Sequence, residues 1–96
     1  MRRIFVADVP DQQFALRTDT GRLTLRLRFN PTTDRWSFDL ARDDDWILYG
    51  RRITTGTDLL GAFGLGVGML FAHETSPTDV PDRAGLVSGR VRLFHA

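Results

Sequence analysis

The chain has 96 residues, of which 42% are hydrophobic and 26% charged, with a formal net charge of +1 and no cysteine. This length and composition predict one globular domain, residues 1–96, and exclude a disordered chain. The near-zero net charge argues against nucleic-acid binding, which needs a basic excess, and the lack of cysteine excludes disulfides and thiolate zinc sites.

Two further features of the composition bound the function. The basic residues are all arginine, which reflects either a coding bias toward G and C or the bidentate and interface ion pairs that arginine favours. The longest apolar-leaning run, residues 59–72, is broken by four glycines and falls short of the roughly 20 residues of a membrane-spanning helix. Too few apolar residues follow Arg3 for a secretory signal, so no membrane partner is expected.

Short stretches of β-prone, often alternating residues follow one another along the chain, separated by turn formers. Asp58 is placed to cap a helical turn at residues 59–63, and residues 76–82 form a loop stiffened by two prolines. Six or seven short strands at regular spacing predict an all-β fold, either a small antiparallel β-barrel or a sandwich. The predicted strands are residues 2–6, 14–18, 22–29, 36–41, 46–53, 68–73 and 86–94.

The strongest local pattern is a β-hairpin in the middle of the chain. Residues 23–29 and 36–40 alternate between apolar and polar, and they flank the turn-forming run Asn-Pro-Thr-Thr-Asp at 30–34. Their apolar sets share one face only if Phe29 lies opposite Trp36, because a slip of one residue would turn one set toward water.

The charges of the hairpin select the same register. With Phe29 opposite Trp36, Arg26 lies opposite Asp39 and a second arginine opposite Asp43. Opposite charges directly across an antiparallel pair contribute roughly 0.2–1 kcal/mol. We therefore expect Asp39 and neighbouring acids to satisfy Arg26 within the chain.

Three short motifs look like binding motifs but fit structural roles better. Residues 64–68, Gly-Leu-Gly-Val-Gly, lack the strand before and the helix after that a dinucleotide-binding loop needs, so a turn or bulge is expected. The three aspartates at 43–45 do not have the spacing of an EF-type calcium loop, so a solvated turn is expected. His73, Glu74 and His95 provide two histidines on separate strands without an apparent third ligand, so no metal is predicted.

No motif supports catalysis. The serines do not lie in a nucleophile elbow, and no pair of carboxylates stands out as an acid and a base, so we predict no enzymatic activity and no cofactor. Trp36 and Trp46 are candidates for a stacking platform, but Trp36 falls on the apolar face of the hairpin and is expected in the core. Residues 46–49, Trp-Ile-Leu-Tyr, are apolar on both faces, which predicts burial under another layer or at an interface.

A series of motifs resembles the small plug proteins of phage baseplates, known from a cyanophage. No single motif is diagnostic, but the series spans nearly the whole chain in the expected order and spacing. The motifs are Leu-Arg-Leu-Arg-Phe-Asn at 25–30, Trp-Ser-Phe-Asp-Leu at 36–40, Gly-Arg-Arg-Ile-Thr-Thr-Gly-Thr-Asp-Leu-Leu at 50–60, Gly-Met-Leu-Phe at 68–71 and Arg-Val-Arg-Leu-Phe at 90–94.

The resemblance implies a structural virion protein of a phage tail, made in the host bacterial cytoplasm. Such a plug closes or lines the channel of the baseplate central hub and joins hub components, so its partners are other baseplate, hub and tail-tip proteins, with several copies around the tail axis as one arrangement. Two alternatives remain open: a small β-barrel that binds a sugar or a lipid-like ligand in its mouth, and a tail assembly adaptor.

The interface residues predicted from the sequence fall into three groups. Arg28 lies opposite Ser37, is expected to lack an internal partner and, with two arginines near the end of the chain, supplies donors for carboxylates of a partner. The segment at 46–49 and the glycine-rich loop at 61–68 are apolar stretches that another chain is expected to cover. The predicted interface residues are Arg28, Arg90, Arg92, Trp46, Leu48, Tyr49, Leu65 and Val67.

Overall fold

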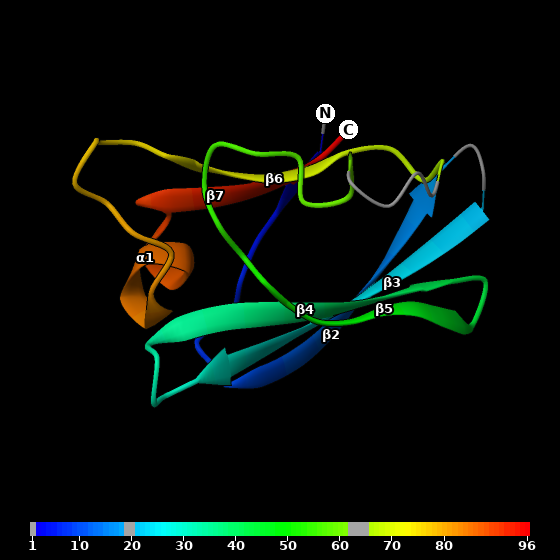
Figure 1. The fold of residues 1–96 in the computed structure, drawn as a ribbon, viewed down its shortest axis with the longest axis horizontal. Coiled ribbons are helices and arrows are strands. Elements are labelled where there is room, and N and C mark those ends of the chain that lie inside the picture. The colour runs from blue at the N-terminus through cyan, green and yellow to red at the C-terminus, as the bar shows by residue number, and fades with distance from the viewer. Residues whose placement is uncertain (1, 19–20, 62–65) are drawn as a thin grey trace.

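The computed structural model describes residues 2–18, 21–61 and 66–96, and in them two antiparallel sheets pack face to face (Figure 1). One sheet has the strand order β1-β7-β6 and the other the order β2-β3-β4-β5. This arrangement confirms the all-β prediction, and of the two architectures it is the sandwich, since the sheets do not close into a barrel. The strands are β1 (Arg2–Ile4), β2 (Asp11–Thr18), β3 (Gly21–Asn30), β4 (Arg35–Arg42), β5 (Asp45–Arg52), β6 (Leu70–Glu74) and β7 (Val91–His95).

The four-stranded sheet is a meander whose central hairpin has the predicted register. Phe29 pairs with Trp36 and Arg26 with Asp39 across β3 and β4. The turn between these strands forms as expected, because the Asn30 side-chain carbonyl accepts a hydrogen bond from the backbone N–H of Thr32 at 3.0 Å. The coincidence of apolar and charge patterns therefore identified the correct pairing.

A two-residue turn joins β4 to β5. Asp43 and Asp44 both have positive φ, 50° and 73°, as a type I′ hairpin turn requires. The Asp43 carboxylate accepts a hydrogen bond from the backbone N–H of Arg22 at 3.0 Å, which ties the turn to the start of β3. The predicted turn thus forms at Asp43 and Asp44, while Asp45 is already the first residue of β5.

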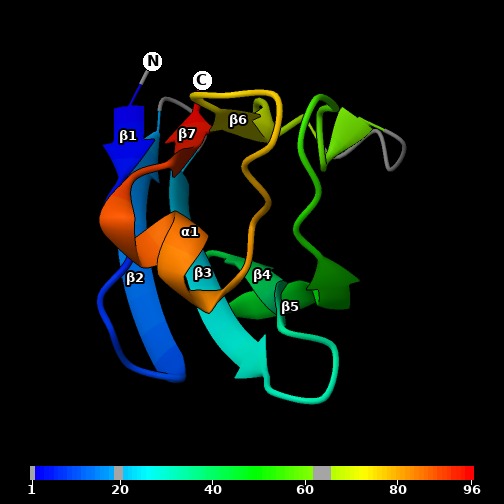
Figure 2. The same ribbon diagram turned by 90° about the vertical axis from the view of Figure 1, so that its left-hand side faces the viewer.

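The predicted last strand, residues 86–94, is wrong in its first half. Arg83–Ser88 forms a short helix, α1, and the strand β7 begins only at Val91. Asp82 caps the helix by accepting from the N–H of Gly85 at 2.7 Å, and Gly89 ends it in the left-handed conformation at φ 86°. These two end signals outweigh the apolar alternation, because α1 buries its apolar side at the end of the sandwich (Figure 2).

The core fills the space between the sheets. Trp36 is fully buried, and its ring meets Phe29 edge-on at a centroid distance of 5.4 Å, so this tryptophan is a core residue as expected. The largest fully buried side chains come from both sheets and from the segment after β5; they are Trp36, Phe38, Leu23, Leu25, Leu27, Ile53, Leu70, Leu93 and Val91. No helix in the described ranges is long and apolar enough to cross a membrane.

The chain crosses from one sheet to the other after β5 and then runs along β6. The backbone N–H of Leu59 donates to the carbonyl of Leu70 at 2.7 Å. The Asp58 carboxylate accepts from the N–H of Leu60 at 3.1 Å, so the predicted cap bond exists. Leu59 and Leu60 form a turn, while residues 62 and 63 of the expected helical turn lie outside the described residues. Gly68 has φ 90° at the contact with Ala96, where a Cβ would lie 2.3 Å from the Ala96 carbonyl oxygen.

Candidate functional site

The outward surface of the four-stranded sheet carries a row of arginines. We call Arg17, Arg22, Arg26 and Arg28, which project from β2 and β3 on the side away from the core, the arginine face. They alternate with buried leucines, so the period-2 pattern of the strands places them all outside. The arginine face is the first candidate surface for binding a partner.

Within the arginine face, Arg26 forms a two-point ion pair with Asp11. Its Nη2 and Nε lie 2.7 and 3.0 Å from the two carboxylate oxygens of Asp11. The hydrogen bonds from Arg26 lower the pKa of Asp11 below its usual 3.8, and the same bonds raise the pKa of Arg26. Arg26 is thus satisfied within the chain, as expected, but its partner is Asp11 rather than its cross-strand neighbour Asp39.

Asp39 is instead the partner of Arg28. The Nη2 atom of Arg28 lies 3.0 Å from Asp39 Oδ2, and Asp39 Oδ1 accepts from the backbone N–H of Gly50 at 2.7 Å. The Asp39 side chain is only 8% exposed, whereas that of Arg28 is 50% exposed. The prediction that Arg28 lacks an internal partner is corrected accordingly, because its long side chain reaches diagonally along the sheet to Asp39 rather than straight across to Ser37.

An exposed aromatic pair, Trp46 and Tyr49, lies on β5. Two register shifts between β4 and β5 insert extra residues into β5, so Leu48 pairs with Leu40 while Trp46 pairs with Ala41. Trp46 and Tyr49 then lie on the same outward side with ring centroids 6.3 Å apart, 38% and 65% exposed. The bulged strand explains the double-sided apolar pattern at 46–49: the aromatic rings face out and Leu48 faces in.

The other predicted interface residues separate from one another. Arg90 and Arg92 are exposed, but Arg92 lies on β7 in the other sheet, with Arg90 just before that strand, so they do not share a face with Arg28. Leu48 and Val67 lie in the core at 6% and 3% exposure, and this corrects their expected place on the surface. Leu65 lies outside the described residues.

The two histidines do not form a common site. His73 pairs with Arg92 and His95 with Leu70 across β6 and β7, which places the two rings on opposite faces of the sheet. The His95 ring nitrogen Nε2 lies 2.8 Å from the carbonyl oxygen of Val67. In the ranges that the structure covers, no group of three or more potential metal ligands gathers.

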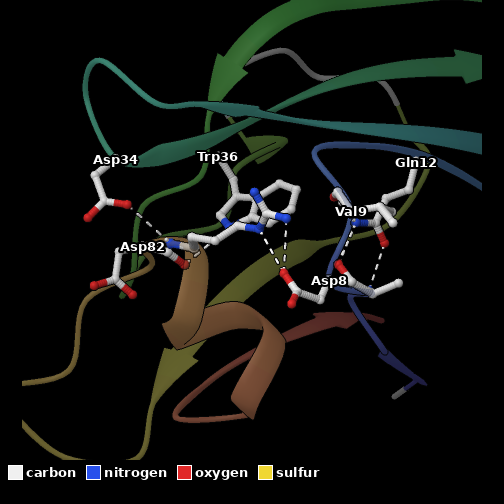
Figure 3. A network of polar contacts seen from close by, with 8 residues as sticks. Asp8, Val9, Gln12, Asp34, Trp36 and Asp82 are labelled. Carbon is white, nitrogen blue, oxygen red and sulfur yellow. Dashed lines mark hydrogen bonds and ion pairs between the residues drawn. The ribbon is translucent and has the colours of Figure 1, made fainter.

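Sequence reasoning missed a polar network around Arg83, at the start of α1 (Figure 3). Arg83 forms an ion pair with Asp8 at 2.9 Å, and its guanidinium lies 5.2 Å from the Phe29 ring centroid. The indole N–H of Trp36 donates to the carbonyl of Asp82 at 3.1 Å. These contacts join residues up to 75 positions apart, and no local pattern signals them.

A second surface missed from the sequence lies on the outside of the three-stranded sheet. Phe71 and Phe94 stack with centroids 5.5 Å apart, and the Arg3 guanidinium lies 4.3 Å from the centroid of Phe5, which is 69% exposed. The outward aromatics of β6 and β7 were the signal available in the sequence. Both sheets of the sandwich thus expose aromatic and arginine side chains.

Comparison with known families shows the family to which the chain belongs. A family described as the cyanophage baseplate Pam3 plug gp18 matches residues 1–96, the whole chain. The chain belongs to this plug family. No curated protein sequence matches it.

Membership of the plug family places the protein in the phage virion, as a structural part of the tail baseplate that contacts other baseplate components. The resemblance inferred from the order of the motifs is thereby confirmed. For a baseplate plug, the exposed aromatic pair and the arginine face are the surfaces to consider for contacts with neighbouring proteins.

Proposed function

We propose that this protein is the plug of the baseplate central hub: it closes or lines the channel and joins hub components, and it has no enzymatic activity of its own. The observation that carries the proposal is the match of the entire chain to the baseplate plug family. The side chains that fill the interior support it, because a mechanical element must keep its shape under load.

In this proposal the aromatic pair Trp46 and Tyr49 anchors the plug in its neighbour. Large exposed aromatics are costly to leave in water and dominate the energetics of protein interfaces. Arg28, in the same sheet, extends this contact by binding carboxylates at its rim, whereas Arg90 and Arg92, at the other sheet, bind carboxylates in a second contact. Arg28 already forms an ion pair with Asp39 through one nitrogen, so its other N–H groups are the ones that donate to carboxylates of the neighbouring protein.

The test is made on phage particles that carry the substitutions. The double variant Trp46→Ala/Tyr49→Ala is expected to lower the amount of this protein in purified virions by about tenfold or more, since each ring is an interface anchor. Quantitative mass spectrometry of the virions measures the amount, and cryo-electron microscopy of the tail tip locates it. Val80→Ala, at another exposed apolar side chain, is the matched control and should leave incorporation unchanged.

Two outcomes would contradict different parts of the proposal. If the wild-type protein is missing from purified virions, or its density lies away from the hub channel, the plug function is wrong. If the double variant is incorporated normally, the aromatic pair is not the anchor, although the plug function can stand.

A further inference from the structure

One edge of the sandwich is open and unusually regular. β2 forms the border of the four-stranded sheet and pairs residue for residue with β3 without a register shift. The opposite border, β5, is interrupted by two shifts, and part of the free edge of β6 is bound by the segment around Leu59. Proteins commonly protect edge strands with bulges, prolines or short length, and β2, with eight residues and no proline, has none of these.

The hydrogen-bonding pattern of the β2–β3 ladder shows which backbone groups are free. The N–H of Phe29 donates to the carbonyl of Pro10, and every second pair from there on is hydrogen-bonded. The odd-numbered residues of β2 therefore direct their N–H and C=O groups away from β3; they are Asp11, Gln13, Ala15 and Arg17. Among the residues that the structure describes, no backbone partner takes these groups.

The charges on this edge are self-complementary. Asp11 begins the strand and Arg17 is near its end, each three residues from Phe14. If a second β2 lies antiparallel with Phe14 opposite Phe14, then Asp11 of each copy, whose carboxylate also binds Arg26 of its own chain, faces Arg17 of the other copy. Gln13 then faces Ala15. In this register the odd-numbered residues form the hydrogen-bonded pairs, as their outward N–H and C=O groups require.

We propose that a second copy of this chain binds along β2, so that two four-stranded sheets join into one continuous sheet about a two-fold axis. Arg17 favours this occupant: its cross-strand neighbour is Arg22, a like charge, and none of the described carboxylates lies within ion-pair distance of it. Phe14, which is only partly buried, gains an aromatic partner across the axis.

The connector between β1 and β2 is fixed by polar side-chain contacts. It is held toward the inner side of the sheet, where the Gln12 side chain bonds the backbone of Ala7 and Val9 and where Asp8 reaches Arg83 (Figure 3). The connector also exposes two apolar side chains, Phe5 and Val9.

The decisive experiment is a charge exchange measured by sedimentation equilibrium on the purified protein. Wild-type protein is expected to dimerise, whereas Arg17→Glu alone and Asp11→Arg alone should each dimerise at least about tenfold more weakly, because both inter-copy contacts become like-charged. An equimolar mixture of the two variants restores opposite charges at both contacts and should dimerise as the wild type does. Circular dichroism checks that each variant is folded.

A second variant tests the backbone contacts. Ala15→Pro removes an N–H that no bond to β3 uses, so it should abolish the dimer while leaving the monomer folded; Ala15→Ser keeps the N–H and is the matched control. Amide exchange should show protection of residues 13 and 15 that rises with protein concentration.

The proposal is overturned if the wild type is monomeric at all accessible concentrations, if the mixture of charge variants stays monomeric, or if Ala15→Pro still dimerises. Because these measurements use the isolated protein, their outcome is independent of the proposed role in the baseplate.

Discussion

Asp39 has the most constrained environment of the outward carboxylates. It is nearly buried on the outward side of β4, and each of its oxygens has one partner, the Arg28 guanidinium or the Gly50 N–H. A carboxylate that is taken out of water must be held in this way, since an unpaired buried charge is strongly unfavourable. Asp39 therefore fixes both the bulged path of β5 and the position of Arg28.

Replacing Asp39 tests this double role. Asp39→Ala leaves the Gly50 N–H and Arg28 without their acceptor and should lower the free energy of unfolding by about 1–3 kcal/mol. Asp39→Asn keeps an acceptor for Gly50 and should cost less. Urea unfolding measures both; an equal loss in the two variants would show that charge alone matters.

The Asp11–Arg26 pair makes stability depend on pH. Because Arg26 lowers the pKa of Asp11 in the folded protein below 3.8, the unfolded chain binds the proton first as the pH falls. The ion pair thus stabilises the fold above that value, and its contribution is lost as the pH drops through the lower folded pKa. Asp11→Asn should be less stable than the wild type at neutral pH, and the difference should shrink in acid; a difference that does not change with pH would contradict this account.

At the scale of elements, α1 and its capping residues cover one end of the sandwich. Asp82→Ala removes the N-cap bond to Gly85 and is expected to lower the unfolding free energy by about 0.5–2 kcal/mol. Asp79→Ala, which removes only a surface contact with Thr75, is the matched control. Equal urea midpoints for the two variants would mean that the cap does not stabilise the helix.

Which elements could be predicted from the sequence depends on how local their signals are. The β3–β4 hairpin was predictable down to its register, because Phe29 and Trp36 are close in sequence and their apolar pattern admits one pairing. The helix was missed because Val87 continues the apolar alternation of β7. The N-cap at Asp82 depends on the backbone conformation of this residue, which the spacing of apolar residues in the sequence does not reveal. The partners of Arg26 and Arg28 were missed because a long side chain reaches diagonal neighbours as easily as opposite ones.

At the scale of the whole molecule, a single core joins two sheets that form one body of 34 × 23 × 21 Å. Trp36 contributes to this core from β4 and also holds the loop before α1 through Asp82. The contributions of the core and of the surface can be measured separately, because Trp36 lies in the core and Trp46 on the surface.

Substitutions at the two tryptophans should therefore differ in their effects on stability and on tryptophan fluorescence. Trp36→Ala should lower the unfolding free energy by about 3–5 kcal/mol, since a large buried side chain is lost. Trp46→Phe should leave stability within about 0.5 kcal/mol of the wild type, because surface changes usually do, and its remaining emission should be that of a buried indole. Comparable losses in the two variants would show that Trp46 is part of the core.

The central place of β7 in its sheet has a consequence for synthesis of the protein. β1 and β6 each pair with β7 and not with one another, and Val91–His95 leaves the ribosome after every other strand. β2 to β5 pair with their neighbours in sequence and can form as they emerge, whereas β1, made first, waits for the last strand. The nascent chain thus passes through a stage in which one sheet is complete and its apolar face uncovered, and this is the point at which a chaperone would have most effect.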